Sequence, residues 1–161
     1  MIRQVITTAL FAITLFIPHG VMAKDSFEVR LWEGVAPGSE GVQDEEKVVE
    51  RGDGVQTIDR SISDTVIPTL TVHLPKHSSK PVTAVIIVPG GGLTRAVIDK
   101  EGNDLARVLA ESGMAGIVLK FRNAQTTTTF NGMDIMEADI RRAIRVTRFH
   151  ASKWNIASNR I

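Results

Sequence analysis

The feature that most constrains the fold is an apolar, β-branched run that leads directly into consecutive glycines. Residues 85–88 read Val-Ile-Ile-Val, and Pro89-Gly90-Gly91-Gly92 follows them. An apolar run without polar alternation suits a strand that is covered on both faces, as in a parallel sheet. We therefore expect a central strand over residues 82–88, with side-chain-free backbone at its carboxyl end, where open α/β sheets bind their ligands.

The segments before this run predict short outer strands. Residues 29–32 and 56–62 alternate, or nearly alternate, apolar and polar residues, and a loop rich in Gly, Pro and acids lies between them. Residues 69–74 alternate cleanly and end at Pro75, which predicts a half-exposed strand at the outside of the sheet.

The segments after the glycines alternate helix and strand. Residues 101–112 predict a helix that stops at Gly113, and residues 115–119 predict a second buried strand, joined to the first by a right-handed crossover. A long helix follows with Asn131 as its N-cap, and Arg160-Ile161 is typical of the start of another strand. The expected apolar face of that helix comprises Met136, Ile140, Ala143, Ile144, Thr147, Ala151 and Trp154. Together these elements predict an α/β fold with an open, mostly parallel sheet and outer antiparallel strands.

The N-terminus has the pattern of a secretory signal. Arg3 gives a basic start, residues 5–17 are apolar and uncharged, and Ala23 ends a short segment of the kind that signal peptidase cleaves. The apolar run is shorter than the roughly 20 residues that a membrane-spanning helix needs. We expect residues 1–23 to be a signal peptide, residues 24–161 to form a partial domain, and the protein to be periplasmic or secreted, without a stable membrane anchor after cleavage.

Charge and cysteine content exclude several classes of partner. Removal of Arg3 with the signal leaves 19 − 1 = 18 Lys and Arg against 18 Asp and Glu, so the mature chain is formally neutral. Neutrality argues against nucleic acid or anionic lipid as a partner and favours a small, uncharged or weakly charged ligand. The chain has no cysteine, which excludes disulfides, a thiolate nucleophile and Cys-ligated metals.

The glycine loop could act on a ligand or could be a simple turn. Its free backbone N–H groups could point at developing negative charge, which is what an oxyanion hole requires. A dinucleotide fingerprint would need glycine where the chain has Arg95, and a P-loop would need lysine where it has Leu93. From spacing alone, an oxyanion loop and a strand-to-helix turn both remain open.

Other titratable residues have ordinary structural explanations. His73 and His77 cannot share a helix because Pro75 lies between them, so we interpret them as the end of a surface strand and not as metal ligands. Asp99 and Glu101 could be a glycosidase-type pair of carboxylates, but the N-terminus of a helix also favours acids.

Three features in the C-terminal part are interpreted in the same way. The i, i+3 spacing of Asp139 and Arg142 predicts a surface ion pair. His150 is expected to be structural or solvated. Thr126 to Thr129 predicts a solvated loop, with a place in a substrate cleft as the alternative.

A series of short motifs resembles the secreted esterases of the α/β-hydrolase superfamily, which include acetyl-xylan and related carbohydrate esterases and are often labelled xylanase-like or lipase-like. The motifs are Leu31-Trp32, Ala36-Pro37-Gly38, Ile67-Pro68-Thr69-Leu70-Thr71-Val72, Pro89-Gly90-Gly91-Gly92, Asp99-Lys100-Glu101-Gly102, Leu119-Lys120-Phe121-Arg122, Asp139 with Arg142-Ala143, and Asn159-Arg160-Ile161. They span nearly all of the mature chain in order.

The resemblance implies a site and an activity. It implies that Gly91 and Gly92 donate the N–H groups of an oxyanion hole, and that a serine hydrolyses short acyl esters, with acetyl groups on carbohydrate as substrates and no cofactor or metal. Pro89 matches the polysaccharide-esterase-like branch, whereas Leu93 stands where related esterases often have an aromatic residue.

The nucleophile that the resemblance implies is not recognisable in the sequence. No serine of the chain lies in Gly-x-Ser-x-Gly, the turn that presents the nucleophile in this superfamily. We therefore expect the chain to be the N-terminal half of the fold, truncated before the strand of the nucleophile elbow, with the serine, acid and histidine after Ile161 and no esterase activity of its own. An exported, non-catalytic domain that binds carbohydrate or a partner, and an inactive truncated product, are the alternatives.

Overall fold

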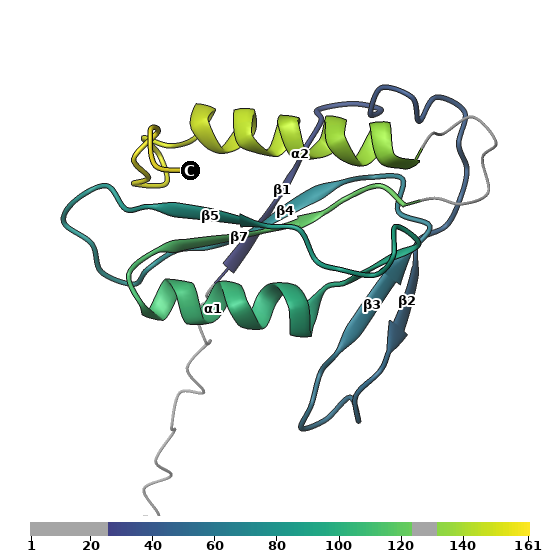
Figure 1. Cartoon of the computed structure of the whole chain (residues 1–161), viewed down its shortest axis with the longest axis horizontal. Helices are drawn as coiled ribbons and strands as arrows, with labels where there is room; N and C mark the ends of the chain where they lie inside the picture. Colours follow the sequence, from purple (N-terminus) through teal and green to yellow (C-terminus); the bar gives the residue numbers. More distant parts are fainter. Residues whose placement is uncertain (1–25, 124–131) are drawn as a thin grey trace, which may run out of the picture.

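The computed structural model describes residues 26–123 and 132–161. A four-stranded sheet lies between two helices, and a three-stranded sheet extends from one end of this layered body (Figure 1). The expected signal peptide, the N-cap Asn131 and the loop from Thr126 to Thr129 lie outside the described residues. No helix in the described part of the chain is both long enough and apolar enough to cross a membrane.

The main sheet is mixed, which confirms an α/β fold but not a mostly parallel sheet. Its strand order is β1-β4-β7-β5, in which β1 pairs with β4 and β4 with β7 in antiparallel fashion, and β5 pairs with β7 in parallel. The expectation of a mostly parallel sheet is therefore wrong for the described strands. The four strands are β1 (Ser26–Arg30), β4 (Thr69–His73), β7 (Ala115–Lys120) and β5 (Ala84–Ile87).

Strand β4 is internal and buried, not half-exposed at the outside of the sheet. Leu70 and Val72 are fully buried, and Thr69 and His73 on the opposite face are buried as well. The polar face of the alternation is covered because helix α1 (Asp104–Glu111) lies against it, and His73 Nε2 is 3.1 Å from Oδ1 of Asn103, the residue before α1. Alternation indicates two different faces but not which of them meets solvent.

Strand β5 has one strand neighbour, β7, within the described residues. Its other edge meets the C-terminal segment: Val82 forms a parallel bridge with Ile156, and Ala84 N–H donates to the carbonyl of Arg160 at 2.9 Å. The expected central strand is therefore flanked on that side by residues 155–161, which run alongside it without forming a strand at Arg160 and Ile161.

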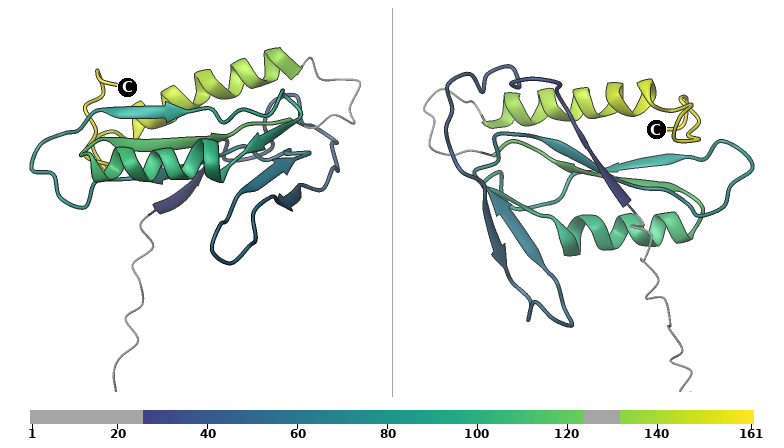
Figure 2. Two further views of the ribbon diagram at one scale, coloured as in Figure 1. Left: turned by 60° about the horizontal axis from the view of Figure 1, so that its bottom comes forward. Right: turned by 180° about the vertical axis from the view of Figure 1, so that it is seen from behind.

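Two helices cover the two faces of the sheet (Figure 2). A π-helical turn, η1 (Asp99–Asn103), leads into α1 (Asp104–Glu111), and Gly113 with φ 84° follows its end, which confirms the expected helix and stop. A Cβ at Gly116 of β7 would lie 2.5 Å from the Cα of Ala106, so α1 packs directly on the strand backbone.

The opposite face is covered by α2 (Gly132–Phe149), which confirms the expected long helix. Its apolar face packs Ala143 and Val146 into the main core. The helix ends at Phe149, and Ala151 and Trp154 reach the same core from the turns that follow it.

The second sheet consists of β2 (Lys47–Glu50), β3 (Arg60–Ser63) and β6 (Arg95–Val97), all antiparallel in the order β2-β3-β6. The expected strand over residues 56–62 begins later, because Asp53 Oδ1 accepts the N–H groups of Val55, Gln56 and Thr57 at 3.0, 2.8 and 2.7 Å. These hydrogen bonds hold the segment in a turn before β3.

Candidate functional site

The glycine loop leaves the carboxyl end of β5 and enters β6. Gly91, Gly92 and Leu93 have φ of 147°, 65° and 63°, so the backbone runs through three successive positive-φ residues. Thr94 closes the turn, since its N–H and its Oγ1 hydroxyl donate to the Gly91 carbonyl at 3.3 and 3.1 Å. A non-glycine residue at positive φ, such as Leu93, is uncommon and is found where the surroundings hold the backbone in place.

Two of the three glycines are required by the conformation of the loop. A Cβ at Gly91 would lie 2.1 Å from the backbone oxygen of Arg95, a contact that no side chain can make. Gly92 has open space around it, and its positive φ is the reason that glycine suits the position. Steric contact therefore requires glycine at position 91, and the backbone conformation favours glycine at position 92.

The N–H groups of Gly91 and Gly92 have no acceptor among residues 26–123 and 132–161. The N–H of Gly90, in contrast, donates to Glu101 Oε2 at 3.1 Å, and the Gly90 carbonyl accepts from Val97 N–H at 2.9 Å. Gly91 is half-buried and Gly92 is exposed. Two adjacent donors, on a loop anchored at both sides, are thus unpaired within the part of the chain that the structure describes.

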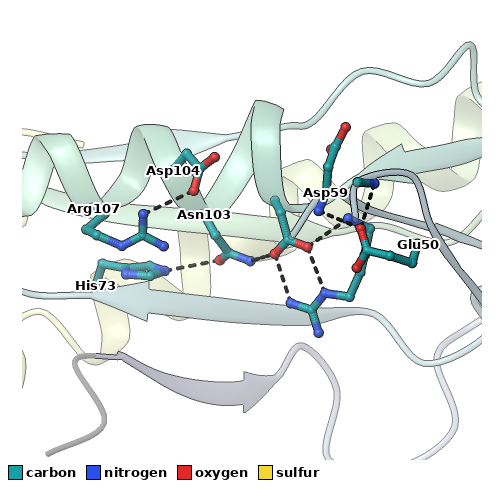
Figure 3. Close-up of polar contacts among 9 residues, drawn as sticks. Glu50, Asp59, His73, Asn103, Asp104 and Arg107 are labelled. Atoms are coloured by element: carbon teal, nitrogen blue, oxygen red, sulfur yellow. Dashed lines mark hydrogen bonds and ion pairs between the residues drawn. The ribbon is translucent and has the colours of Figure 1, made fainter. Parts of the chain in front are cut away.

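An ion pair joins the second sheet to the start of η1. Asp99 Oδ2 accepts from Arg60 Nε at 2.7 Å and from Arg60 N–H at 2.9 Å, and Oδ1 accepts from Arg60 Nη2 at 2.8 Å. Asn103 Nδ2 also donates to Asp99 Oδ1 at 3.0 Å. The Oδ1 of Asn103 in turn lies 3.1 Å from His73 Nε2 (Figure 3). Burial opposes ionisation of Asp99, but the hydrogen bonds from Arg60 and Asn103 outweigh it and lower the pKa of Asp99 to about 2.

Asp99 and Glu101 therefore have structural partners and do not face each other across an open site. Asp99 lies in the first turn of η1, as the helix N-terminus interpretation predicts, and its two oxygens are taken by Arg60 and Asn103. Glu101 faces the glycine loop through the N–H of Gly90. This arrangement does not support a glycosidase-type pair, which needs two carboxyls on either side of a sugar.

Removing the charge of Asp99 is expected to destabilise the fold in a pH-dependent way. The folded pKa of about 2 lies below the unfolded value of 3.8, so the stabilisation is present above about pH 4 and is lost as the pH falls through about 2. We expect Asp99→Asn to lower the free energy of unfolding by about 2 kcal/mol at pH 7. Urea unfolding of both proteins from pH 7 to pH 2 measures this, and the difference should shrink as the pH falls; a difference independent of pH contradicts the assignment.

A second ion pair corrects the prediction for Asp139. Asp139 is fully buried, not on the surface, and its partner is Arg122, whose Nη2 donates to Oδ1 at 2.8 Å. Arg122 Nη1 donates to the Pro37 carbonyl at 2.7 Å and to Ser39 Oγ at 3.1 Å. The expected i, i+3 partner, Arg142, instead donates to the Leu31 carbonyl at 3.0 Å.

His73 and His150 have structural contacts, and His77 is exposed. His73 is buried beside Asn103, which contradicts its expected place at the end of a surface strand, and the described residues contain no group of three or more His, Cys, Asp or Glu that could hold a metal ion. His150 stacks on Trp154 with ring centroids 4.8 Å apart and an interplanar angle of 20°. Its expected structural role agrees with this contact.

The fold of the described residues is similar to part of the fold of solved hydrolases and esterases, which confirms the resemblance at the level of the fold. An acetyl ester-xyloside bifunctional hydrolase from Caldicellulosiruptor lactoaceticus superposes with a TM-score of 0.53 at 22% identity, over 88% of this chain and 42% of its own. A thermophilic esterase from the Planctomycetes species Thermogutta terrifontis, with propionate bound, superposes with a TM-score of 0.52 at 20% identity, over 78% of this chain and 41% of its own.

This chain therefore spans less than half of the length of either structure. No protein-family model and no curated protein matches it. At these identities the similarity concerns the fold, so the glycine loop itself is the basis for any assignment of chemistry.

Proposed function

We propose that the protein is a serine ester hydrolase of short acyl esters, in which Gly91 and Gly92 form the oxyanion hole. The observation that carries this proposal is the pair of adjacent N–H groups without an acceptor among the described residues, at the carboxyl end of β5. Attack of a serine hydroxyl on an ester carbonyl places negative charge on the carbonyl oxygen. Two fixed N–H donors aimed at that oxygen stabilise it more than they stabilise the neutral ester.

The rigidity of the loop supports this role. Preorganised donors are effective because they need no reorganisation when the charge develops. Hydrogen bonds hold the glycine loop on both sides. The Gly90 N–H donates to Glu101, the Gly90 carbonyl accepts from the Val97 N–H, and the Gly91 carbonyl accepts from Thr94. These contacts constrain the peptide groups on either side of the two free donors.

Two observations support a proposal for the substrate class. The motifs in the sequence resemble carbohydrate esterases, and one structure with the same fold is named an acetyl ester-xyloside bifunctional hydrolase. We therefore propose that the substrate carries acetyl groups on carbohydrate. We also propose that the protein acts in the periplasm or the medium after removal of residues 1–23. The nucleophile, acid and histidine of the triad are not assigned to residues of this chain, since none of its serines lies in Gly-x-Ser-x-Gly.

Hydrolysis of p-nitrophenyl esters tests the proposal. We expect the complete gene product to hydrolyse the acetate ester with a kcat/KM at least about tenfold above that of the octanoate ester, because a short-acyl site excludes extra methylenes. Absence of hydrolysis by the complete gene product contradicts the proposed function.

A further inference from the structure

A cleft of about 620 Å³ lies on one face of the second sheet and reaches the end of the glycine loop. Its lining includes Lys47 and Arg51 from the β2 side, Ser61 and Ser63 from β3, and Thr94 and Arg95 at the loop. Thr94 is also the residue that closes the turn on the carbonyl of Gly91. The cleft and the two free N–H groups are therefore joined by a single short segment.

The register of the sheet places two cations on either side of a hydroxyl group. Lys47 lies opposite Ser63, and Ser63 lies opposite Arg95. Residues directly opposite one another in an antiparallel pair share a face, with Cβ atoms about 5 Å apart. Lys47, Ser63 and Arg95 thus form a row across the cleft face, and Ser61 lies next to Ser63 on the same face.

The charge of this cleft differs from that of the chain as a whole. Three cations, Lys47, Arg51 and Arg95, line it against one carboxylate, Asp64, although the mature chain is formally neutral. Asp64 is 2.9 Å from Lys47 Nζ, and Arg51 Nη2 is 3.6 Å from Asp59. Arg95 is exposed and its guanidinium has no hydrogen bond or ion pair among the described residues.

We propose that this cleft binds a carboxylate on the alcohol portion of the ester, which makes a carbohydrate that carries uronic acid the preferred substrate. The inference rests on the proposed function for the orientation of the substrate. Arg95 provides the planar, bidentate donor that matches a carboxylate. Thr94 and Arg95 of the cleft follow Gly91 and Gly92 within four residues of the chain, so the cleft adjoins the glycine loop.

Calorimetric titration of the complete gene product tests the inference without requiring turnover. The probes are a xylo-oligosaccharide that carries one glucuronic acid, the same oligosaccharide without it, and inorganic phosphate. We expect the acidic oligosaccharide to bind more tightly than the neutral one at low ionic strength, with an advantage that decreases as salt is added. Equal affinity for the two oligosaccharides, or tighter binding of phosphate than of the acidic oligosaccharide, overturns the inference.

Substitutions locate the binding to Arg95. Arg95→Gln should weaken binding of the acidic oligosaccharide about fivefold and leave the neutral one unchanged, and Arg95→Lys should retain part of the preference. Arg145→Gln is the control, because Arg145 is an exposed arginine on α2 that does not line this cleft. An equal effect of Arg95→Gln and Arg145→Gln contradicts the inference. If the unsubstituted protein binds the acidic oligosaccharide more tightly than the neutral one but does not hydrolyse esters, the proposed function is overturned and the binding of a carboxylate in the cleft is not.

Discussion

Replacement of Asp139 by alanine is expected to lower the free energy of unfolding by about 3–5 kcal/mol, the largest effect on stability that we predict for one side chain. The carboxylate is fully buried, and Arg122, with a side chain only 3% exposed, would keep its charge without a counter-ion. The same substitution removes the acceptor of Arg122 N–H at 3.1 Å and of Trp32 Nε1 at 3.4 Å. Asp139 thus joins α2, the end of β7 and the segment after β1.

Equilibrium unfolding in urea measures this loss, with Glu137→Ala as the matched control. Glu137 lies on the same helix and pairs with Arg141 at 2.6 Å, but both side chains are exposed. Exposed pairs of this kind contribute about 0.3–0.5 kcal/mol, because water screens the charges. A loss for Asp139→Ala as small as that for Glu137→Ala would contradict the structural role of the buried pair.

The burial of Asp139 could have been inferred from helical periodicity. It lies three residues after Met136 and four before Ala143, which are both positions on the predicted apolar face. The i, i+3 spacing to Arg142 was the misleading signal, because that rule describes neighbours on an exposed helix surface. The actual partner, Arg122, is 17 residues away, and sequence spacing carries no information on a contact of that kind.

Other elements were predictable to different degrees. The apolar run over residues 115–119 and the stop at Gly113 specify β7 and the end of α1 locally, and both predictions are confirmed. The burial of β4 depends on α1 covering its polar face, and the partner of Asp99 lies 39 residues away at Arg60. The glycine loop was recognisable from its run of consecutive glycines, but the steric need for Gly91 depends on the position of the Arg95 carbonyl.

The second large effect is expected at Gly91. A methyl group there would meet the Arg95 backbone oxygen at 2.1 Å, so Gly91→Ala must move the peptide groups that carry the two free donors. Loss of one oxyanion donor lowers kcat by about 10²–10³ in serine hydrolases, because the donor stabilises the transition state more than the ester. We expect kcat for p-nitrophenyl acetate to fall about 100-fold or more, with little change in KM.

Gly113→Ala is the matched control for strain. Gly113 also has positive φ, at 84°, but a methyl group added to it would have no atom within 4 Å, and the residue follows α1, away from the loop. An alanine in the left-handed region costs about 1–2 kcal/mol of backbone strain, and Gly91→Ala adds a steric contact with the Arg95 oxygen that Gly113→Ala lacks. Thermal unfolding of both variants separates a change in stability from a change in catalysis.

The ratio of kcat for Gly91→Ala to kcat for Gly113→Ala in the complete gene product tests whether the glycine loop stabilises the oxyanion in ester hydrolysis. We expect a ratio of about 0.01 or less at a temperature where both variants are folded, with similar KM values. Equal kcat values for the two variants would contradict the assignment of Gly91 and Gly92 as oxyanion donors and leave the loop as a strand-to-strand turn.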